Sequence, residues 1–206
     1  MQIIVKGTTG SGVAPIEAGS YRAICYGLVV LGTTYSAAFD KAQTSVLFLF
    51  ELPDERITVN GEDLPRAISV TYNLPKVMTE KSNLWKFLVS WRGKEFTPEE
   101  LEGFDLVNVL GAPCLVSTTI GVSKQGREFA KVSGVARLPK GMIVPKETEN
   151  EKVLFDITNP DCPIEEMEKL PEWIQNRIKE SVEYKQRTDT SDFEIIADDQ
   201  DLPFDV

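Results

Sequence analysis

The chain has 206 residues, an apolar fraction of 42% and a formal net charge of -10, which suits one domain with extensions. It contains no histidine, so the commonest general base and the commonest metal ligand are missing, and no nucleophile motif or phosphate-binding loop is present. We therefore expect no enzyme activity, no cofactor and no metal site.

Three cysteines, Cys25, Cys114 and Cys162, lie far apart in the sequence and form no metal-binding pair. We interpret them as small apolar residues of a protein from a reduced compartment. No apolar stretch approaches the ~20 residues that span a bilayer, and no signal peptide opens the chain. A soluble cytoplasmic protein without a membrane partner is the expectation.

Three strands are predicted in the first part of the chain. Residues 1–18 are rich in glycine and predict an irregular N-terminal arm. Aromatic and β-branched residues dominate 21–31 and 44–51, and 66–73 alternates apolar with polar side chains, the period of a strand. Lys41 lies in the loop between the first two strands.

The apolar period then changes to that of a helix, which we expect Thr79 to cap and Gly93 to end. Its apolar stripe consists of Leu84, Phe87, Leu88 and Trp91. Trp85 lies about 100° around the helix from Leu84, so we expect its ring to face solvent. A short second helix is predicted over 97–103, with proline at its first position.

Two further strands, 113–122 and 127–136, flank a short glycine-containing turn at 123–126 and predict a hairpin. Five strands with a helix between the third and fourth match an OB-fold, a small barrel that binds oligonucleotides on strands 2 and 3 and in loops 1-2 and 4-5. The fold class is therefore mainly β with helices, and we assign the OB-fold barrel to 19–146.

The remaining chain divides into two parts. Residues 147–187 are interpreted as a linker and a C-terminal helix that begins near Leu170, packing on the barrel or on a second copy of the chain, so a homo-oligomer is conceivable. Its apolar stripe contains Trp173, Ile174, Ile178 and Val182. Residues 188–206 have seven acidic and no basic residues and are interpreted as an acidic disordered tail.

The fifth strand carries the main candidate site. Arg127, Phe129 and Lys131 share one face of it, and Lys124 lies in the preceding turn. Binding single strands without reading sequence requires cations along the phosphates and flat rings for the bases. A solvated strand face with one exposed ring is the alternative.

Lys41 joins the hairpin residues in the predicted binding groove, whereas the other nucleic-acid candidates each have a structural explanation. Phe48 and Tyr72 fit a core as well as a stacking platform, and the two cations after the first helix fit a helix cap. The full set of candidates is Lys41, Phe48, Tyr72, Arg92, Lys94, Lys124, Arg127, Phe129 and Lys131.

The charge is unevenly distributed along the chain. Residues 1–146 hold 16 basic against 14 acidic residues, so the negative charge belongs to the C-terminal part. Acidic residues at the end of the chain flank a short apolar segment, Leu202 to Phe204, which is available to a partner surface. An ordinary solvating tail is the alternative. The candidate partner-binding residues are Asp198, Asp199, Asp201, Leu202, Pro203 and Phe204.

This tip resembles the acidic tail of bacterial and phage single-stranded DNA-binding proteins, except that Asp205 and Val206 follow the phenylalanine. Long stretches at 80–116 and 126–141 resemble a family of tailed-phage OB-fold single-stranded DNA-binding proteins. Shorter similar stretches, in the same order, are LGTT at 31–34, FELPDER at 50–56 and LPEWIQNRIKES at 170–181.

The resemblance implies sequence-nonspecific coating of single-stranded DNA in phage replication or recombination. It also implies recruitment of replication or recombination proteins through the tail, in the cytoplasm of a bacterial host cell. The alternative function is a protein-interaction adaptor with an OB-like domain and no nucleic-acid binding.

Overall fold

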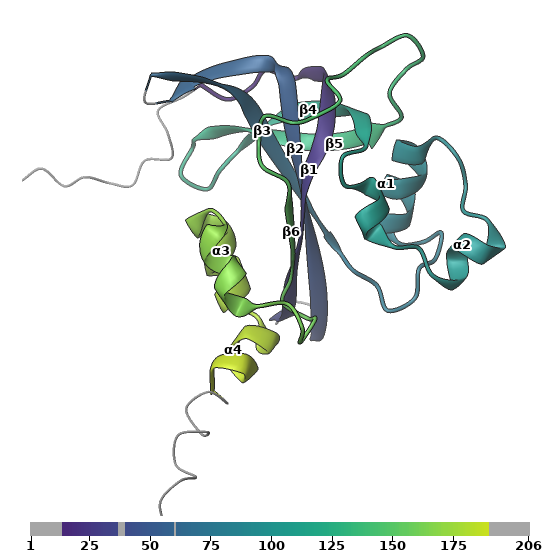
Figure 1. Ribbon diagram of the computed structural model, residues 1–206, viewed down its shortest axis with the longest axis vertical. Coiled ribbons are helices and arrows are strands. Elements are labelled where there is room, and N and C mark those ends of the chain that lie inside the picture. The colour runs from purple at the N-terminus through teal and green to yellow at the C-terminus, as the bar shows by residue number, and fades with distance from the viewer. Residues whose placement is uncertain (1–13, 37–39, 60, 190–206) are drawn as a thin grey trace, which may run out of the picture.

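The computed structural model describes residues 14–36, 40–59 and 61–189. Five antiparallel strands in the order β3-β2-β1-β4-β5 curl into a half-barrel, and a short sixth strand pairs with β1 in parallel (Figure 1). The strands are β1 Gly19–Ser36, β2 Lys41–Val59, β3 Glu62–Asn73, β4 Pro113–Val122, β5 Glu128–Ala136 and β6 Val153–Asp156. All five predicted strands are present, and the first three are longer than predicted.

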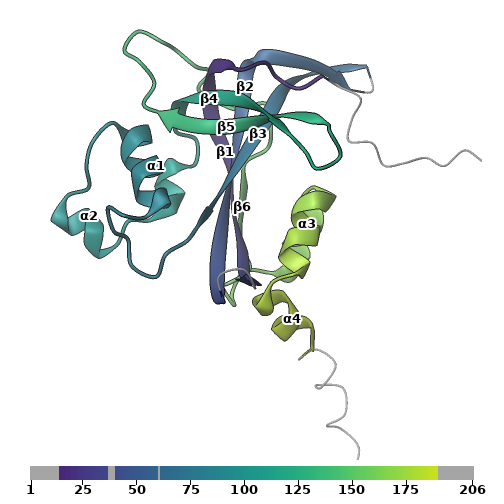
Figure 2. The same cartoon turned by 180° about the vertical axis from the view of Figure 1, so that it is seen from behind.

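Helices flank the long strands on two sides. Figures 1 and 2 show α1 and α2 on one side and α3 and α4 on the other. Their bounds are α1 Asn83–Arg92, α2 Pro98–Glu102, α3 Glu172–Lys179 and α4 Val182–Asp189, with 3-10 turns η1 Leu106–Val109 and η2 Ile164–Lys169. None of the described helices has the length and apolarity needed to cross a membrane.

The two faces of β2 enter two separate apolar cores. Phe48 and Phe50 pack toward α1, whereas Leu47 and Leu49 pack with β6, η2 and α3. Phe48 is 0% exposed and its ring lies 4.9 Å from that of Phe87. This burial removes Phe48 from the candidates for base stacking, because covering elements on both sides of the sheet leave neither face of this part of β2 wet.

The start of α1 differs from its prediction. Ser82, not Thr79, is the N-cap, and its hydroxyl accepts a hydrogen bond of 3.1 Å from the backbone N–H of Trp85. The Trp85 ring is 7% exposed and lies 4.7 Å from the Phe96 ring. The expectation that this tryptophan faces solvent is therefore wrong, because the segment after α1 folds back over it.

The C-terminal part is integrated into the fold rather than attached through a linker. β6 lies beside β1, and Phe155 and Ile157 are buried in the second core. The predicted single helix breaks before α4 at Ser181, which is 0% exposed. A Cβ placed on Gly32 of β1 would lie 2.5 Å from the Ser181 Cβ, so the break brings the chain directly onto the strand.

The cysteines have environments that make their reactivity testable. Burial raises the pKa of the Cys25 thiol to about 12 and raises that of Cys114 well above its usual value, whereas Cys162 is only partly buried. Because the thiolate is the nucleophile, iodoacetamide at about pH 8 should label Cys162 first in the folded protein. Peptide mass spectrometry would measure this, and rapid labelling of Cys25 would contradict the burial.

Candidate nucleic-acid interface

The β4–β5 hairpin is closed by a short turn with defined hydrogen bonds. The backbone N–H of Ser123 donates to the Arg127 carbonyl at 2.8 Å, and the N–H of Gly126 donates to the Ser123 carbonyl at 2.9 Å. Gly126 has a φ of 76°, a left-handed conformation that glycine adopts without strain. The predicted turn is thus confirmed, and it places Lys124 at the tip.

Phe129 lies on this hairpin opposite a glycine. The register pairs it with Gly121 of β4, and a Cβ on that glycine would lie 2.7 Å from the Phe129 Cζ. The ring therefore rests on the backbone of β4, in space that any other residue would fill. Since its side chain is still 45% exposed, one side of the ring is covered by the strand and the other is open.

The hairpin cations are exposed and uncompensated. Lys124, Arg127 and Lys131 are all exposed, and within the described ranges none of them forms an ion pair. By contrast, Arg22 pairs with Asp54 across the fold. The hairpin thus combines an open ring with cations that form no ion pair among the described residues.

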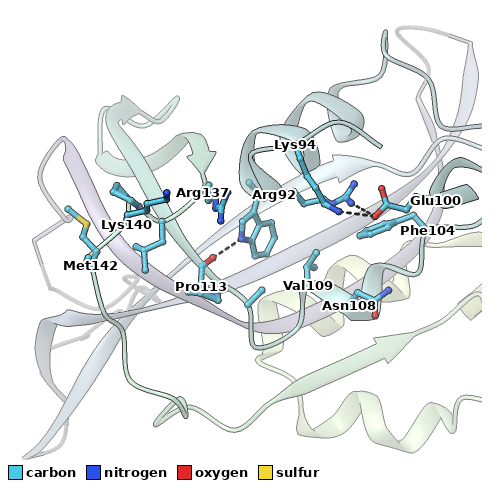
Figure 3. Close-up of a pocket in the computed structure, with 15 residues that line it drawn as sticks. Arg92, Lys94, Glu100, Phe104, Asn108, Val109, Pro113, Arg137, Lys140 and Met142 are labelled. Carbon is cyan, nitrogen blue, oxygen red and sulfur yellow. Dashed lines mark hydrogen bonds and ion pairs between the residues drawn. The ribbon is translucent and has the colours of Figure 1, made fainter. Parts of the chain in front are cut away.

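A pocket of about 660 Å³ beside α1 contains two other candidates, Arg92 and Lys94 (Figure 3). The Arg92 guanidinium forms an ion pair with Glu100 and lies 4.3 Å from the centre of the Phe96 ring. The Lys94 ammonium is 3.4 Å from the same Glu100 carboxylate. Hydrogen bonding from Arg92 lowers the Glu100 pKa to about 2, so this carboxylate stays ionised at neutral pH.

Arg92 is consequently a structural cation rather than a phosphate contact. Its side chain is only 12% exposed, and its buried Nη1 has no hydrogen-bond partner in the part of the chain that the structure describes. Lys94 remains 62% exposed at the pocket edge, although its charge is shared with Glu100. The ion pair of Arg92 with Glu100 holds the end of α1 to α2. This contact favours a structural role for Arg92 over phosphate binding.

Lys41 and Tyr72 lie apart from both the hairpin and the pocket beside α1, in a hollow of about 680 Å³ at the end of β3. We call it the lysine groove and define it by Lys41, Lys76 and Lys81, which all line it. The Tyr72 ring packs 4.4 Å from the Phe87 ring, and burial raises the Tyr72 pKa. Tyr72 is therefore a core ring at the groove rim, with little free face for a base.

The structure brings together only part of the predicted site. Lys124, Arg127, Phe129 and Lys131 form one surface on the hairpin, whereas the other candidates lie in the groove, in the pocket beside α1 or in the core. The partner-binding residues of the tail lie outside the described residues. Of the predicted nucleic-acid-binding residues, those of the hairpin are the ones that the alternation of a strand indicates.

Two exposed rings are not among the site residues predicted from the sequence. Tyr35 is 62% exposed and Trp173 is 47% exposed, which with Phe129 makes them the exposed aromatic residues of the described chain. The sequence predicts Trp173 in the apolar stripe of a C-terminal helix, but within α3 only Ile174 and Ile178 are buried. A single aromatic at the margin of a stripe gives no sequence signal for which side it faces.

Comparisons of the chain with protein-family models, curated proteins and solved structures return no match. The protein is mainly β, with a curled, five-stranded antiparallel half-barrel and a few helices. On this framework, the β4–β5 hairpin is the surface that best fits a polyanionic ligand with planar groups.

Proposed function

We propose that the protein binds single-stranded DNA without sequence preference, with the β4–β5 hairpin as its primary contact. The observation that carries this function is the Phe129 ring, which rests on Gly121 and stays open on one side between exposed cations. Every base has a π-face, so a ring of this kind binds bases of any identity. The adjacent Arg127 and Lys131 attract the phosphates.

An OB-fold barrel is part of the proposal. In the half-barrel β1 lies between β2 and β4, and α1 lies between β3 and β4 in the chain, an arrangement that supports an OB-like topology. The β4–β5 turn then corresponds to the loop 4-5 through which such barrels contact oligonucleotides. The start of β2 corresponds to loop 1-2.

The cellular role follows from the sequence resemblance. We propose that the protein acts in phage DNA replication or recombination in the cytoplasm of a bacterial host, and that its acidic tail recruits partner proteins. Opposite charges on the tail and on the hairpin are compatible with these two roles, because charges more than about 10 Å apart are largely screened in physiological salt. An acidic tail beyond this distance does not cancel the cations of the hairpin.

A protein-interaction adaptor is the second candidate. Ile120 is 40% exposed and Val122 is 66% exposed on β4. Their cross-strand partners are Ala130 and Glu128, so these apolar side chains lie on the hairpin face opposite Phe129. An exposed apolar face favours contact with a protein.

A fluorescence titration with a labelled oligothymidine separates the two functions. DNA binding predicts saturable binding whose affinity falls with salt, and Lys131→Ala should reduce the slope of log K against log salt by about 0.7 for a single strand. Lys152→Ala, which removes an exposed lysine outside the hairpin, serves as the matched control. An absence of saturable binding at moderate salt would favour the adaptor.

A further inference from the structure

The lysine groove is built from segments far apart in the sequence. The start of β2 contributes Lys41 to Thr44, the end of β3 contributes Thr71 to Asn73, and the connection to α1 supplies Lys76 and Lys81. Pairing of Ser45 with Asn73 brings the two strand ends together. The lysines therefore meet only in the folded protein.

The charge of this groove distinguishes it from the other hollows. No aspartate or glutamate lines it, and among the described residues none of its three lysines forms an ion pair. Asp40 and Glu80 adjoin the groove in sequence without lining it. The pocket beside α1, in contrast, contains Glu100. Three like charges around one hollow repel one another, so an anion bound between them lowers the electrostatic energy.

Two neighbouring features also suit a nucleic acid. Ser82 and Asn83 at the N-terminus of α1 line the groove, and the first turn of this helix has no acidic residue, so its positive end is uncompensated. Tyr35, 62% exposed, is the cross-strand partner of Ala42, which lines the groove. A ring for a base thus lies next to cations for the phosphates.

We propose that the lysine groove is a second phosphate-contact site for the same strand that binds the hairpin, with Tyr35 stacking a base beside it. The groove lies at the Ser36 end of β1, whereas the hairpin is joined to β1 at Gly19. At about 3.3 Å per residue these ends are roughly 50 Å apart along the strand. Only a long oligonucleotide reaches both contacts, and this second contact rests on the proposed function.

The test compares the double variant Lys76→Ala/Lys81→Ala with the wild-type protein on two oligothymidines of about 6 and about 30 nucleotides, the first near the lower end of the ~4 to 16 nucleotides that one OB-fold covers and the second beyond its upper end. For the long strand we expect the salt slope to fall by about 1.4 and the affinity at about 0.1 M salt to fall about 20-fold. For the short strand, bound at the hairpin alone, the affinity should be unchanged. Tyr35→Ala should weaken only long-strand binding, without a change in salt slope.

Two controls isolate the charge of the groove. Lys76→Arg/Lys81→Arg keeps the charge and should restore the long-strand slope, and Lys152→Ala removes a lysine elsewhere and should leave it unchanged. An unchanged long-strand slope in the alanine variant would overturn the second contact, and so would an equal loss on both strands. If the wild-type protein binds neither strand, the proposed function itself fails, which is a distinct result.

Discussion

Phe129→Ala is expected to weaken single-stranded DNA binding by about 5- to 150-fold, because one stacked base contributes about 1 to 3 kcal/mol. The salt slope should stay unchanged, since the substitution removes a ring and no charge. Fluorescence anisotropy over a range of salt concentrations measures both quantities. The ring is 45% exposed, so most of the loss should appear in binding rather than in folding stability.

Gly121→Ala is the informative companion, because it moves the ring without removing it. The new methyl group would lie 2.7 Å from the Phe129 Cζ, which forces the ring off the strand. We expect weaker DNA binding in this variant as well, with Phe129→Trp retaining affinity. The competing explanation is that the ring only shields the glycine backbone. Wild-type DNA affinity in Phe129→Ala, together with reduced thermal stability, would favour that explanation.

The second large effect concerns a buried carboxylate. Glu51 on β2 is 1% exposed and accepts three hydrogen bonds from the segment before β6. Its donors are the Asn150 backbone N–H at 2.8 Å, the Asn150 side-chain amide at 2.7 Å and the Glu149 backbone N–H at 3.2 Å. This carboxylate therefore joins the C-terminal segment to the half-barrel.

Glu51→Ala should lower the free energy of unfolding by about 3 to 5 kcal/mol, because it leaves three donors without their acceptor and opens a cavity. Urea denaturation followed by tryptophan fluorescence would measure the loss. Glu149→Ala is the matched control, since it removes only the partly exposed side-chain pair with Arg56, and pairs of this kind contribute less than about 1 kcal/mol. Equal losses in the two variants would contradict the role of Glu51.

Local features were predictable where neighbouring residues determine them. The capping box of α2 joins Thr97 to Glu100 within one turn, and the hairpin turn depends on a left-handed glycine at position 126. Strand β4 begins and ends at the predicted residues 113 and 122. For the same reason, period-two alternation placed Arg127, Phe129 and Lys131 on one strand face before any tertiary contact was known.

Other features had no local signal. On β2 the apolar residues occupy both faces, so the sequence leaves open which face is covered, and only the packing of α1 on one side and α3 on the other buries both. β6 has four residues, too few to show a period, and its parallel pairing with β1 joins segments more than a hundred residues apart. Trp85 is buried against the prediction, because helical periodicity does not show which later segment folds over a helix.

The five strands, the helix between the third and fourth, and the ring and cations of the hairpin are predictable from the residues alone, because alternation and turn chemistry act between near neighbours. It is folding that buries Phe48, pairs Arg92 with Glu100 and brings three separated lysines to one groove. These outcomes depend on contacts between residues distant in the chain, and no local pattern encodes them.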